Sequence, residues 1–393
     1  MTMPAEPAVK LRHHLADQLQ AAGELRSPEW RQAVESVPRE VFIGNRIYRQ
    51  TGQAGGASWE PTIRAEVGPT DWLALAYQDE TLVTQIAGHD QDPRSGPVEG
   101  APSSSSTLPS LVVRMLEDLD VHDGNTVLEI GTGTGYSTAL MCERLGDANV
   151  TSIEVDPDVA ARARTALAIA GYRPALVCGD GLSGESAHAP YDRVIATCSV
   201  RAVPASWVNQ CRPGGRILTT LSGWLYAYGY VDLEVAERDR AHGHFLPGTV
   251  SFMTARPHAA PFLTQLPARE GTERITCTGA DLLDDWTGRF LAQLAAPAAC
   301  RATLVDDDGR PAHVIVDMDT RAYAWLQQRG PDEWSVIEGG PSTLWRTVEE
   351  TVEAWRQAGE PGQQAFTLSI TPDVQTVQLD HGGHHLTWTL PRP

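Results

Sequence analysis

The segment VLEIGTGTGYS, residues 127–137, constrains the fold of this chain more than any other. It joins a short apolar stretch, which predicts a buried strand, to a predicted helix through a turn containing Gly131, Gly133 and Gly135. Glycines at such a turn let the backbone approach a ligand closely, and the helix N-terminus offers free N–H groups. We therefore expect a ligand site where this strand ends.

Predicted strands and helices alternate regularly through the middle of the chain. The predicted strands are residues 126–131, 148–156, 174–180, 191–199 and 216–223. One of the helices between them, residues 157–171, has Pro157 near its start and Gly171 at its end. This alternation predicts an α/β fold with a doubly wound, mostly parallel sheet. Residues 230–257 alternate without a helix, which indicates an antiparallel hairpin at one edge of the sheet.

The segments on either side of this core have different patterns. Residues 8–22 and 27–37 predict helices, with Ser27 as an N-cap, whereas residues 50–104 have the Gly, Pro and Ser content of exposed loops. Residues 301–318 predict a hairpin, residues 343–359 a helix and residues 365–380 a strand pair. We expect a catalytic domain at 1–257, with N-terminal helices (8–40), a variable loop region (50–104) and a core (105–257). A smaller α+β accessory domain, with peptide binding as its candidate role, is expected at 258–393.

Composition narrows the class of partner. The formal net charge of −19 argues against a nucleic-acid partner, which requires a basic surface. The six cysteines lack paired spacing, and no apolar run is long enough to cross a membrane, so a reduced cytoplasm is the expected location. The histidines at 242–244 and 381–385 and the aspartates at 306–308 are interpreted as turn residues, and no metal site is expected.

Three acidic residues lie in or at the end of predicted core strands, where their carboxylates could accept hydrogen bonds from a bound nucleoside. Glu129 lies inside the first core strand, Glu154 near the end of the second and Asp180 at the end of the third. Ligands bind at the carboxyl ends of strands in an open α/β sheet. The third glycine also comes one residue sooner than in a dinucleotide-binding loop, which favours S-adenosylmethionine as the ligand. The predicted cofactor site comprises Glu129, Gly131, Thr132, Gly133, Gly135, Tyr136, Glu154, Val155, Gly179, Asp180 and Gly181.

Several motifs in order make the chain resemble the protein-L-isoaspartate O-methyltransferases. VPREVFI (37–43) is similar to the family's VPRE-x-F segment, and STLPSLVVRM (106–115) to its S-x-P-x-x-V-A-x-M segment. VLEIGTGTGYSTAL and YDRVIATCSVRAVPASWVNQCRPGGRILTTLSG resemble the glycine loop and the block that follows it. The resemblance covers about residues 10–255. It implies a carboxyl methyltransferase acting on Asp or isoAsp of a peptide or protein, whose methyl ester closes to a succinimide that hydrolyses to Asp or isoAsp.

The hydroxyl run ahead of the core has two interpretations. Its composition is that of a linker, but it precedes a helix that leads into the glycine loop. A carboxylate nucleophile is already ionised at neutral pH, so the enzyme needs donors to hold it rather than a general base. We expect Ser105, Ser106 and Thr107 to hold the substrate carboxylate, and leave Ser103 and Ser104 open between linker and site.

The chain departs from the family pattern in several places: residues 50–70 and 89–102 lengthen the approach to the core, and Thr107 stands where the family usually has Ser. YQDETLVTQIAG (77–88) replaces a proline-containing segment, and residues 258–393 have no counterpart in the single-domain repair enzyme. Extended chains of this kind resemble methyltransferases of ribosomally made modified peptides, in lanthipeptide and ATP-grasp (graspetide) pathways. A general isoaspartyl repair enzyme and a non-catalytic peptide-binding scaffold are the alternatives. The oligomeric state is left open.

Overall fold

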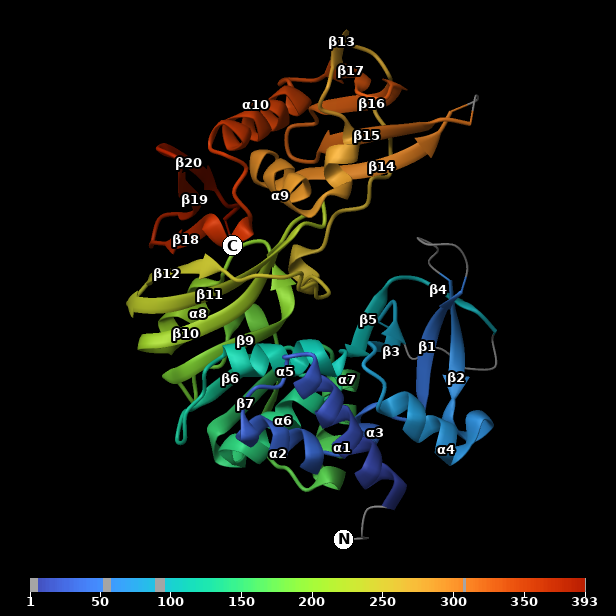
Figure 1. Cartoon of the computed structure of the whole chain (residues 1–393), viewed down its shortest axis with the longest axis vertical. Coiled ribbons are helices and arrows are strands. Elements are labelled where there is room, and N and C mark those ends of the chain that lie inside the picture. The colour runs from blue at the N-terminus through green and yellow to red at the C-terminus, as the bar shows by residue number, and fades with distance from the viewer. Residues whose placement is uncertain (1–5, 52–57, 89–95, 307–308, 393) are drawn as a thin grey trace. The chain divides into compact units, whose positions relative to one another are not determined.

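The computed structural model describes residues 6–51, 58–88, 96–306 and 309–392 and divides the chain into two compact units (Figure 1). Unit 1 comprises residues 1–197 and 206–218, and unit 2 comprises residues 198–205 and 219–393. This division does not coincide with the predicted boundary at residue 257. Strands β9 (Tyr191–Val200) and β10 (Cys211–Ser222) each continue from unit 1 into unit 2.

Unit 1 contains the predicted alternating core. Its helices are α1 (Glu6–Ala21), α2 (Pro28–Ser36), α3 (Arg39–Phe42), α4 (Arg64–Ala76), α5 (Pro109–Asp118), α6 (Tyr136–Leu145) and α7 (Pro157–Ala170). The core strands are β6 (Val127–Ile130), β7 (Val150–Glu154) and β8 (Ala175–Cys178), beside β9. The short helix α8 (Ala205–Gln210) lies between β9 and β10.

The core strands lie in the order β8-β7-β6-β9, and each neighbouring pair is parallel. All residues of β6 and β7 are buried, as expected for parallel strands that are covered on both faces. Because parallel strands share one carboxyl edge, the segments that follow β6, β7 and β8 lie close together. The predicted α/β core is confirmed.

The expected loop region 50–104 is mostly ordered, which corrects the prediction. Its described part forms a second sheet in the order β4-β2-β1-β3-β5, made of β1 (Arg46–Thr51), β2 (Ser58–Ile63), β3 (Leu82–Ile86), β4 (Val98–Glu99) and β5 (Pro102–Ser106). Widely spaced apolar residues supply its core, a cluster of Tyr48, Trp59, Val83, Ile86 and Val98. Residues 52–57 and 89–95 of the expected loops lie outside the described residues.

Unit 2 contains β11 (Tyr228–Glu237), β12 (Arg240–Phe245), β18 (Phe366–Ile370), β19 (Gln375–His381) and β20 (His384–Thr389). The predicted β11–β12 hairpin is confirmed, but its expected place at a sheet edge is wrong. β12 pairs on its other side with β18, and antiparallel pairing continues through β19 to β20. Distant parts of the sequence therefore share one sheet.

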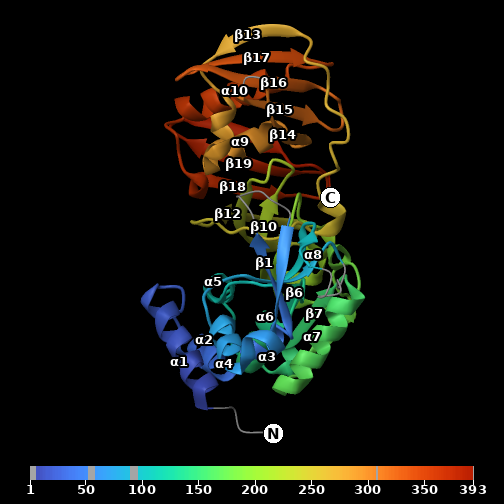
Figure 2. The same cartoon turned by 90° about the vertical axis from the view of Figure 1, so that its right-hand side faces the viewer.

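A further sheet of unit 2 has the order β13-β17-β16-β15-β14. Its strands are β13 (Thr272–Thr276), β14 (Ala299–Val305), β15 (Pro311–Asp317), β16 (Tyr323–Gly330) and β17 (Glu333–Gly339). Helix α10 (Leu344–Gln357) packs on β16 and β17 beside α9 (Trp286–Ala295), as Figure 2 shows. The predicted hairpin at 301–318 is confirmed as β14–β15, although Asp307 and Asp308 of its turn are outside the described residues.

Among the described residues, no helix is both long and apolar enough to span a bilayer.

Candidate functional site

The glycine loop between β6 and α6 adopts backbone conformations that favour glycine. The φ angles of Gly131, Gly133 and Gly135 are 93°, 55° and 90°. The N–H of Gly131 donates to the carbonyl of Ile153 (2.9 Å), which ties the loop to β7. Helix α6 then begins at Tyr136, so its N-terminus lies directly behind the loop.

The Glu154 carboxylate lies against this loop. Its Oε2 accepts a hydrogen bond from the N–H of Gly133 (2.9 Å), and its Oε1 accepts one from the N–H of Asp156 (3.0 Å). The side chain is largely buried, whereas the next residue, Val155, is exposed. Glu154 was predicted at the end of the second core strand, and the structure places its carboxylate beside the glycine loop.

The segment after β8 joins the same place. The N–H of Gly179 donates to the carbonyl of Glu154 (2.9 Å). A Cβ on Gly181 would lie 2.6 Å from Cγ2 of Ile130, so the backbone passes directly over the end of β6. Asp180 is exposed, and its Oδ1 accepts from the N–H of Leu182 (3.0 Å). The structure thus brings together the predicted residues that follow β6, β7 and β8.

Two predicted ligand residues of the glycine segment point inward. Glu129 is fully buried, and its carboxylate accepts hydrogen bonds from the hydroxyls of Ser137, Thr138 and Ser152. Burial raises the pKa of Glu129, and these hydroxyl donors oppose that rise. Thr132 is also buried, with its Oγ1 2.6 Å from the hydroxyl oxygen of Ser152. The side chains of Glu129 and Thr132 therefore pack beneath the loop and support it. The sequence had instead predicted that both residues contact the ligand.

Tyr136, another predicted ligand residue, is also buried. Its ring lies 6.0 Å from that of Phe42 and 5.8 Å from the guanidinium carbon of Arg39. Its hydroxyl has no hydrogen-bond partner among the described residues. The Tyr136 side chain therefore packs against α3, and its backbone begins α6 directly after the glycine loop.

The serine run is an edge strand, not a flexible linker. Residues 102–106 form β5, which pairs with β3. The Ser103 hydroxyl donates to Oε1 of Gln85 and accepts from the N–H of Gly88, both at 2.8 Å. The Thr84 hydroxyl donates to Ser104 Oγ (3.3 Å). These contacts with β3 and the residues just after it hold the serines, which are not among the residues enriched in strands, in a strand here.

The three predicted substrate-binding hydroxyls are not equivalent. Ser105 and Thr107 are partly exposed, whereas Ser106 is 1% exposed and its hydroxyl has no partner among the described residues. Side chains alternate across a strand, so neighbouring serines of β5 face opposite sides. The Ser105 carbonyl oxygen would lie 3.6 Å from a Cβ on Gly133, which places the strand beside the glycine loop.

Buried Arg39 fixes the corner between β5 and α5. Its guanidinium donates to the carbonyls of Ser106 (3.4 Å) and Thr107 (3.2 Å), and to three more carbonyls in the segment from Ala76 to Glu80. Burial lowers the pKa of Arg39 to about 10. The N-terminus of α5 is capped by Asp79, whose Oδ1 accepts from the N–H of Ser110 (2.8 Å). The Thr107 hydroxyl is therefore carried on a rigid turn.

Comparison with known proteins agrees with this arrangement. Residues 64–224 match the model of the family described as Protein-L-isoaspartate(D-aspartate) O-methyltransferase. The chain is 30% identical to a Thermococcus onnurineus protein-L-isoaspartate O-methyltransferase, over 59% of this chain and 89% of the relative. An Ignicoccus hospitalis protein of the same name is 30% identical over 52% and 78% of the two chains. The chain belongs to the protein-L-isoaspartate O-methyltransferase family. It is an S-adenosylmethionine-dependent methyltransferase.

A solved protein-L-isoaspartate O-methyltransferase shares the fold of the chain beyond the region matched by the family model. The two structures superpose with a TM-score of 0.53 at 20% identity, over 94% of this chain and 99% of the other. The predicted methyltransferase fold is confirmed. The similarity of fold also extends into the C-terminal residues, for which the single-domain repair enzyme offered no counterpart.

Four residues around the protein-L-isoaspartate O-methyltransferase site were missed by sequence reasoning. Arg39 and Thr197 lie inside quoted family motifs, and the Thr197 hydroxyl donates to the carbonyls of Ile130 and Gly131. Asp156 caps α7 by accepting from two N–H groups, a role that its place before Pro157 could have indicated. Gln85 had no signal, because it lies in the segment that departs from the family pattern.

The residues present fit S-adenosylmethionine. The three left-handed glycines carry no side chains, and among the described residues a Cβ on Gly133 would have only the Ser105 carbonyl within 4 Å. Glu154 supplies a carboxylate beside Gly133, and Asp180 supplies an exposed one beyond β8. A sulfonium ligand with ribose and adenine groups requires this kind of acceptor-rich, uncrowded surface.

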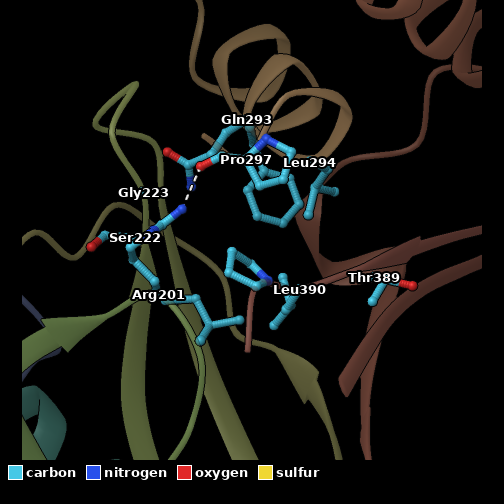
Figure 3. A pocket seen from close by; sticks show the side chains of 11 residues that line it. Arg201, Ser222, Gly223, Gln293, Leu294, Pro297, Thr389 and Leu390 are labelled. Atoms are coloured by element: carbon cyan, nitrogen blue, oxygen red, sulfur yellow. Dashed lines mark hydrogen bonds between the residues drawn. The ribbon is translucent and has the colours of Figure 1, made fainter. Parts of the chain in front are cut away.

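Unit 2 has a separate pocket, lined by the end of β10, by α9 and by Thr389–Pro391 (Figure 3). It encloses about 370 Å³ of empty space, part of it open to solvent. Its one charged side chain, Arg201, donates to the carbonyl of Pro297 (2.8 Å) and stacks 3.7 Å from the centre of the Trp224 ring. The pocket contains none of the predicted site residues.

Proposed function

We propose that this chain methylates the free carboxylate of an Asp side chain or of an isoAsp residue in a peptide. The observation that carries the proposal is the placement of β5 beside the glycine loop, with the Ser105 carbonyl next to Gly133. Ser105 and Thr107 are both partly exposed, and we infer that their hydroxyls are available beside the place where the glycine loop and Glu154 would hold S-adenosylmethionine.

The cofactor would be held by the backbone of the glycine loop and by two acids. We infer that Gly131, Gly133 and Gly135 admit its methionine part, that Glu154 accepts from its ribose hydroxyls and that Asp180 accepts from its adenine amino group. Glu154 retains this capacity because each carboxylate oxygen has two lone pairs and each has one hydrogen bond from the chain. When bound, the cofactor supplies an electrophilic methyl group.

The remaining work of the chain is to hold and desolvate the acceptor. A carboxylate near neutral pH is ionised, because its pKa is ~4, so no side chain has to remove a proton. Thr107 and Ser105 donate hydrogen bonds to this carboxylate without pairing it with a cation, which would weaken it as a nucleophile. Arg39 restricts the Ser106–Thr107 turn, so the hydroxyl of Thr107 is oriented before the substrate arrives.

The ester product has a defined further reaction. The backbone nitrogen that follows the esterified residue attacks the ester carbonyl, a C–N bond forms, and methanol leaves as the succinimide closes. Hydrolysis of either succinimide carbonyl then gives Asp or isoAsp. These steps take place within the peptide and need no further group from the chain.

The substrate is proposed to be a ribosomally made, post-translationally modified peptide of the lanthipeptide or graspetide class. The support is the resemblance of the C-terminal segments GGPSTLWRTVEETVEAW and FTLSITPD to methyltransferases of those pathways. General repair of isoaspartyl proteins is the second candidate, and it is favoured by the names of the 30%-identical relatives. Residues 258–393 are proposed to help bind the peptide.

The Thr107→Ala variant tests the site. We expect methyl transfer from labelled S-adenosylmethionine to a synthetic isoaspartyl peptide to fall at least roughly tenfold, with S-adenosylhomocysteine affinity unchanged by calorimetry. Ser106→Ala is the matched control, since its buried, unpartnered hydroxyl should be dispensable. Equal losses in the two variants, or weakened cofactor binding in Thr107→Ala, would contradict the substrate-side role of Thr107.

Mass spectrometry separates the two substrate classes. A precursor peptide from a neighbouring biosynthetic gene and a generic isoaspartyl peptide are incubated with enzyme and cofactor, and the gain of one methyl is followed. Preference for the precursor supports the pathway role. Equal or faster methylation of the generic peptide supports repair instead.

A further inference from the structure

Gln85 is a buried amide between the serine strand and the second core strand of unit 1. It lies on β3 with 1% of its surface exposed. Its Oε1 accepts from the hydroxyl of Ser103 (2.8 Å), and its Nε2 donates to Oδ2 of Asp156 (3.3 Å). The side chain thus connects β5 to the segment just beyond β7.

The contact with Asp156 continues to the glycine loop. The N–H of Asp156 donates to Oε1 of Glu154 (3.0 Å), whose Oε2 accepts from the N–H of Gly133 (2.9 Å). Asp156 is itself held by α7, because its Oδ1 accepts from the N–H groups of Asp158 (3.0 Å) and Val159 (3.1 Å). A continuous path of hydrogen bonds therefore runs from Ser103 through Gln85, Asp156 and Glu154 to Gly133.

We propose that Gln85 is a positioning residue that couples peptide binding at the serine strand to cofactor binding at Glu154 and Gly133. The inference rests on the proposed function, since it takes β5 as the substrate strand and Glu154 as a cofactor residue. A ligand bound along β5 favours one position of Ser103, and through Gln85 it favours one position of the Asp156–Glu154 turn. Cofactor bound at that turn would in the same way favour one placement of β5.

An amide is suited to this position because its two neighbours require opposite hydrogen-bond partners. Ser103 donates its hydroxyl proton, so it needs an acceptor, whereas the Asp156 carboxylate needs a donor. Methionine has nearly the same length and shape as glutamine but can form neither bond effectively. Gln85→Met therefore removes the connection while the buried volume changes little.

Calorimetry measures the coupling directly. The affinity of a short isoaspartyl peptide is determined with and without saturating S-adenosylhomocysteine, for wild type and for Gln85→Met. We expect the cofactor product to tighten peptide binding by a factor of roughly 5 or more in wild type, within the usual range of coupling between sites. In Gln85→Met we expect this factor to fall toward one, while each ligand alone still binds. Equal factors in the two proteins, or no coupling in wild type, would overturn the proposal.

Two further variants separate coupling from loss of structure. Gln78→Met changes an exposed glutamine between α4 and β3 and should keep the wild-type factor. Ser103→Ala breaks only the first bond of the path and should reduce the factor even if Gln85→Met does not fold; an unchanged factor in Ser103→Ala would contradict the proposal. If wild type neither binds nor methylates the isoaspartyl peptide but still binds S-adenosylhomocysteine, the proposed function fails rather than the coupling.

Discussion

The N–H of Gly133 and the Oε2 of Glu154 are joined by a hydrogen bond of 2.9 Å. The two residues are 21 positions apart in the sequence and come together because β6 and β7 are parallel neighbours that end at the same edge. The contact holds a carboxylate beside a glycine that has no side chain to obstruct a ligand. This combination is what the proposed cofactor site requires.

Gly133→Ala is expected to weaken S-adenosylhomocysteine binding by roughly tenfold or more, about 1.4 kcal/mol, and Gly133→Val to abolish it. The added side chain would occupy space that the proposed site leaves for the ligand, and the φ of 55° strains an L-residue. Gly146→Ala is the matched control, because Gly146 also has a positive φ but lies at the other end of α6, in open space. Calorimetry should show normal affinity in Gly146→Ala; similar losses in both variants would indicate backbone strain alone.

Glu154→Gln is expected to lower S-adenosylhomocysteine affinity by roughly tenfold. Both carboxylate oxygens accept from backbone N–H groups, of Gly133 and Asp156, and an amide offers only one acceptor to these two donors. Asp158→Asn changes an exposed acid on the next turn of chain and serves as the control. Titration calorimetry measures the S-adenosylhomocysteine affinity of both variants. Retained affinity in Glu154→Gln would exclude Glu154 from the cofactor site.

Arg39→Met is expected to lower the free energy of unfolding by roughly 3 kcal/mol. The substitution leaves five buried or partly buried carbonyl oxygens without their guanidinium donor. Denaturant unfolding of Arg39→Met is compared with that of Arg49→Met, which changes an exposed arginine of β1. If the two variants unfold alike, the Ser106–Thr107 turn does not depend on Arg39.

Gln375→Ala is expected to destabilise unit 2 by about 2 kcal/mol, because two buried hydrogen bonds are lost. Gln375 accepts from the N–H of Val203 (2.9 Å) and donates to the carbonyl of Val203 (2.6 Å), which holds the segment after β9 to β19. Gln378→Ala, three residues along the same strand, is the control, since Gln378 is only partly buried. Thermal unfolding of the two variants gives the comparison, and equal midpoints would show that β19 does not support Val203.

Sequence-based prediction succeeded where an element depends on residues close to it in the sequence and failed where it depends on distant ones. The core from β6 to β9 was predicted well, because apolar strands, helix caps and the glycine loop are each specified within a few residues. The strand β5 was not predicted, because its serines pair with β3 and contact Thr84 and Gln85 on that strand and Gly88 just beyond it, about 20 residues earlier in the sequence. The central place of β12 was also missed, since its partner β18 lies more than a hundred residues away.

By itself, the sequence determined the α/β core, the glycine turn and the strand ends that carry Glu154 and Asp180, since the pattern of apolar residues and the restricted backbone of glycine act locally. Only the tertiary structure decided which side chains of these motifs are buried and which are accessible. It turned Glu129, Thr132, Tyr136 and Ser106 inward and left Ser105 and Thr107 partly exposed. It also placed Gln85 between Ser103 and Asp156. Burial and hydrogen bonding of a polar side chain depend on the segments that pack around it, and those segments lie far away in the sequence.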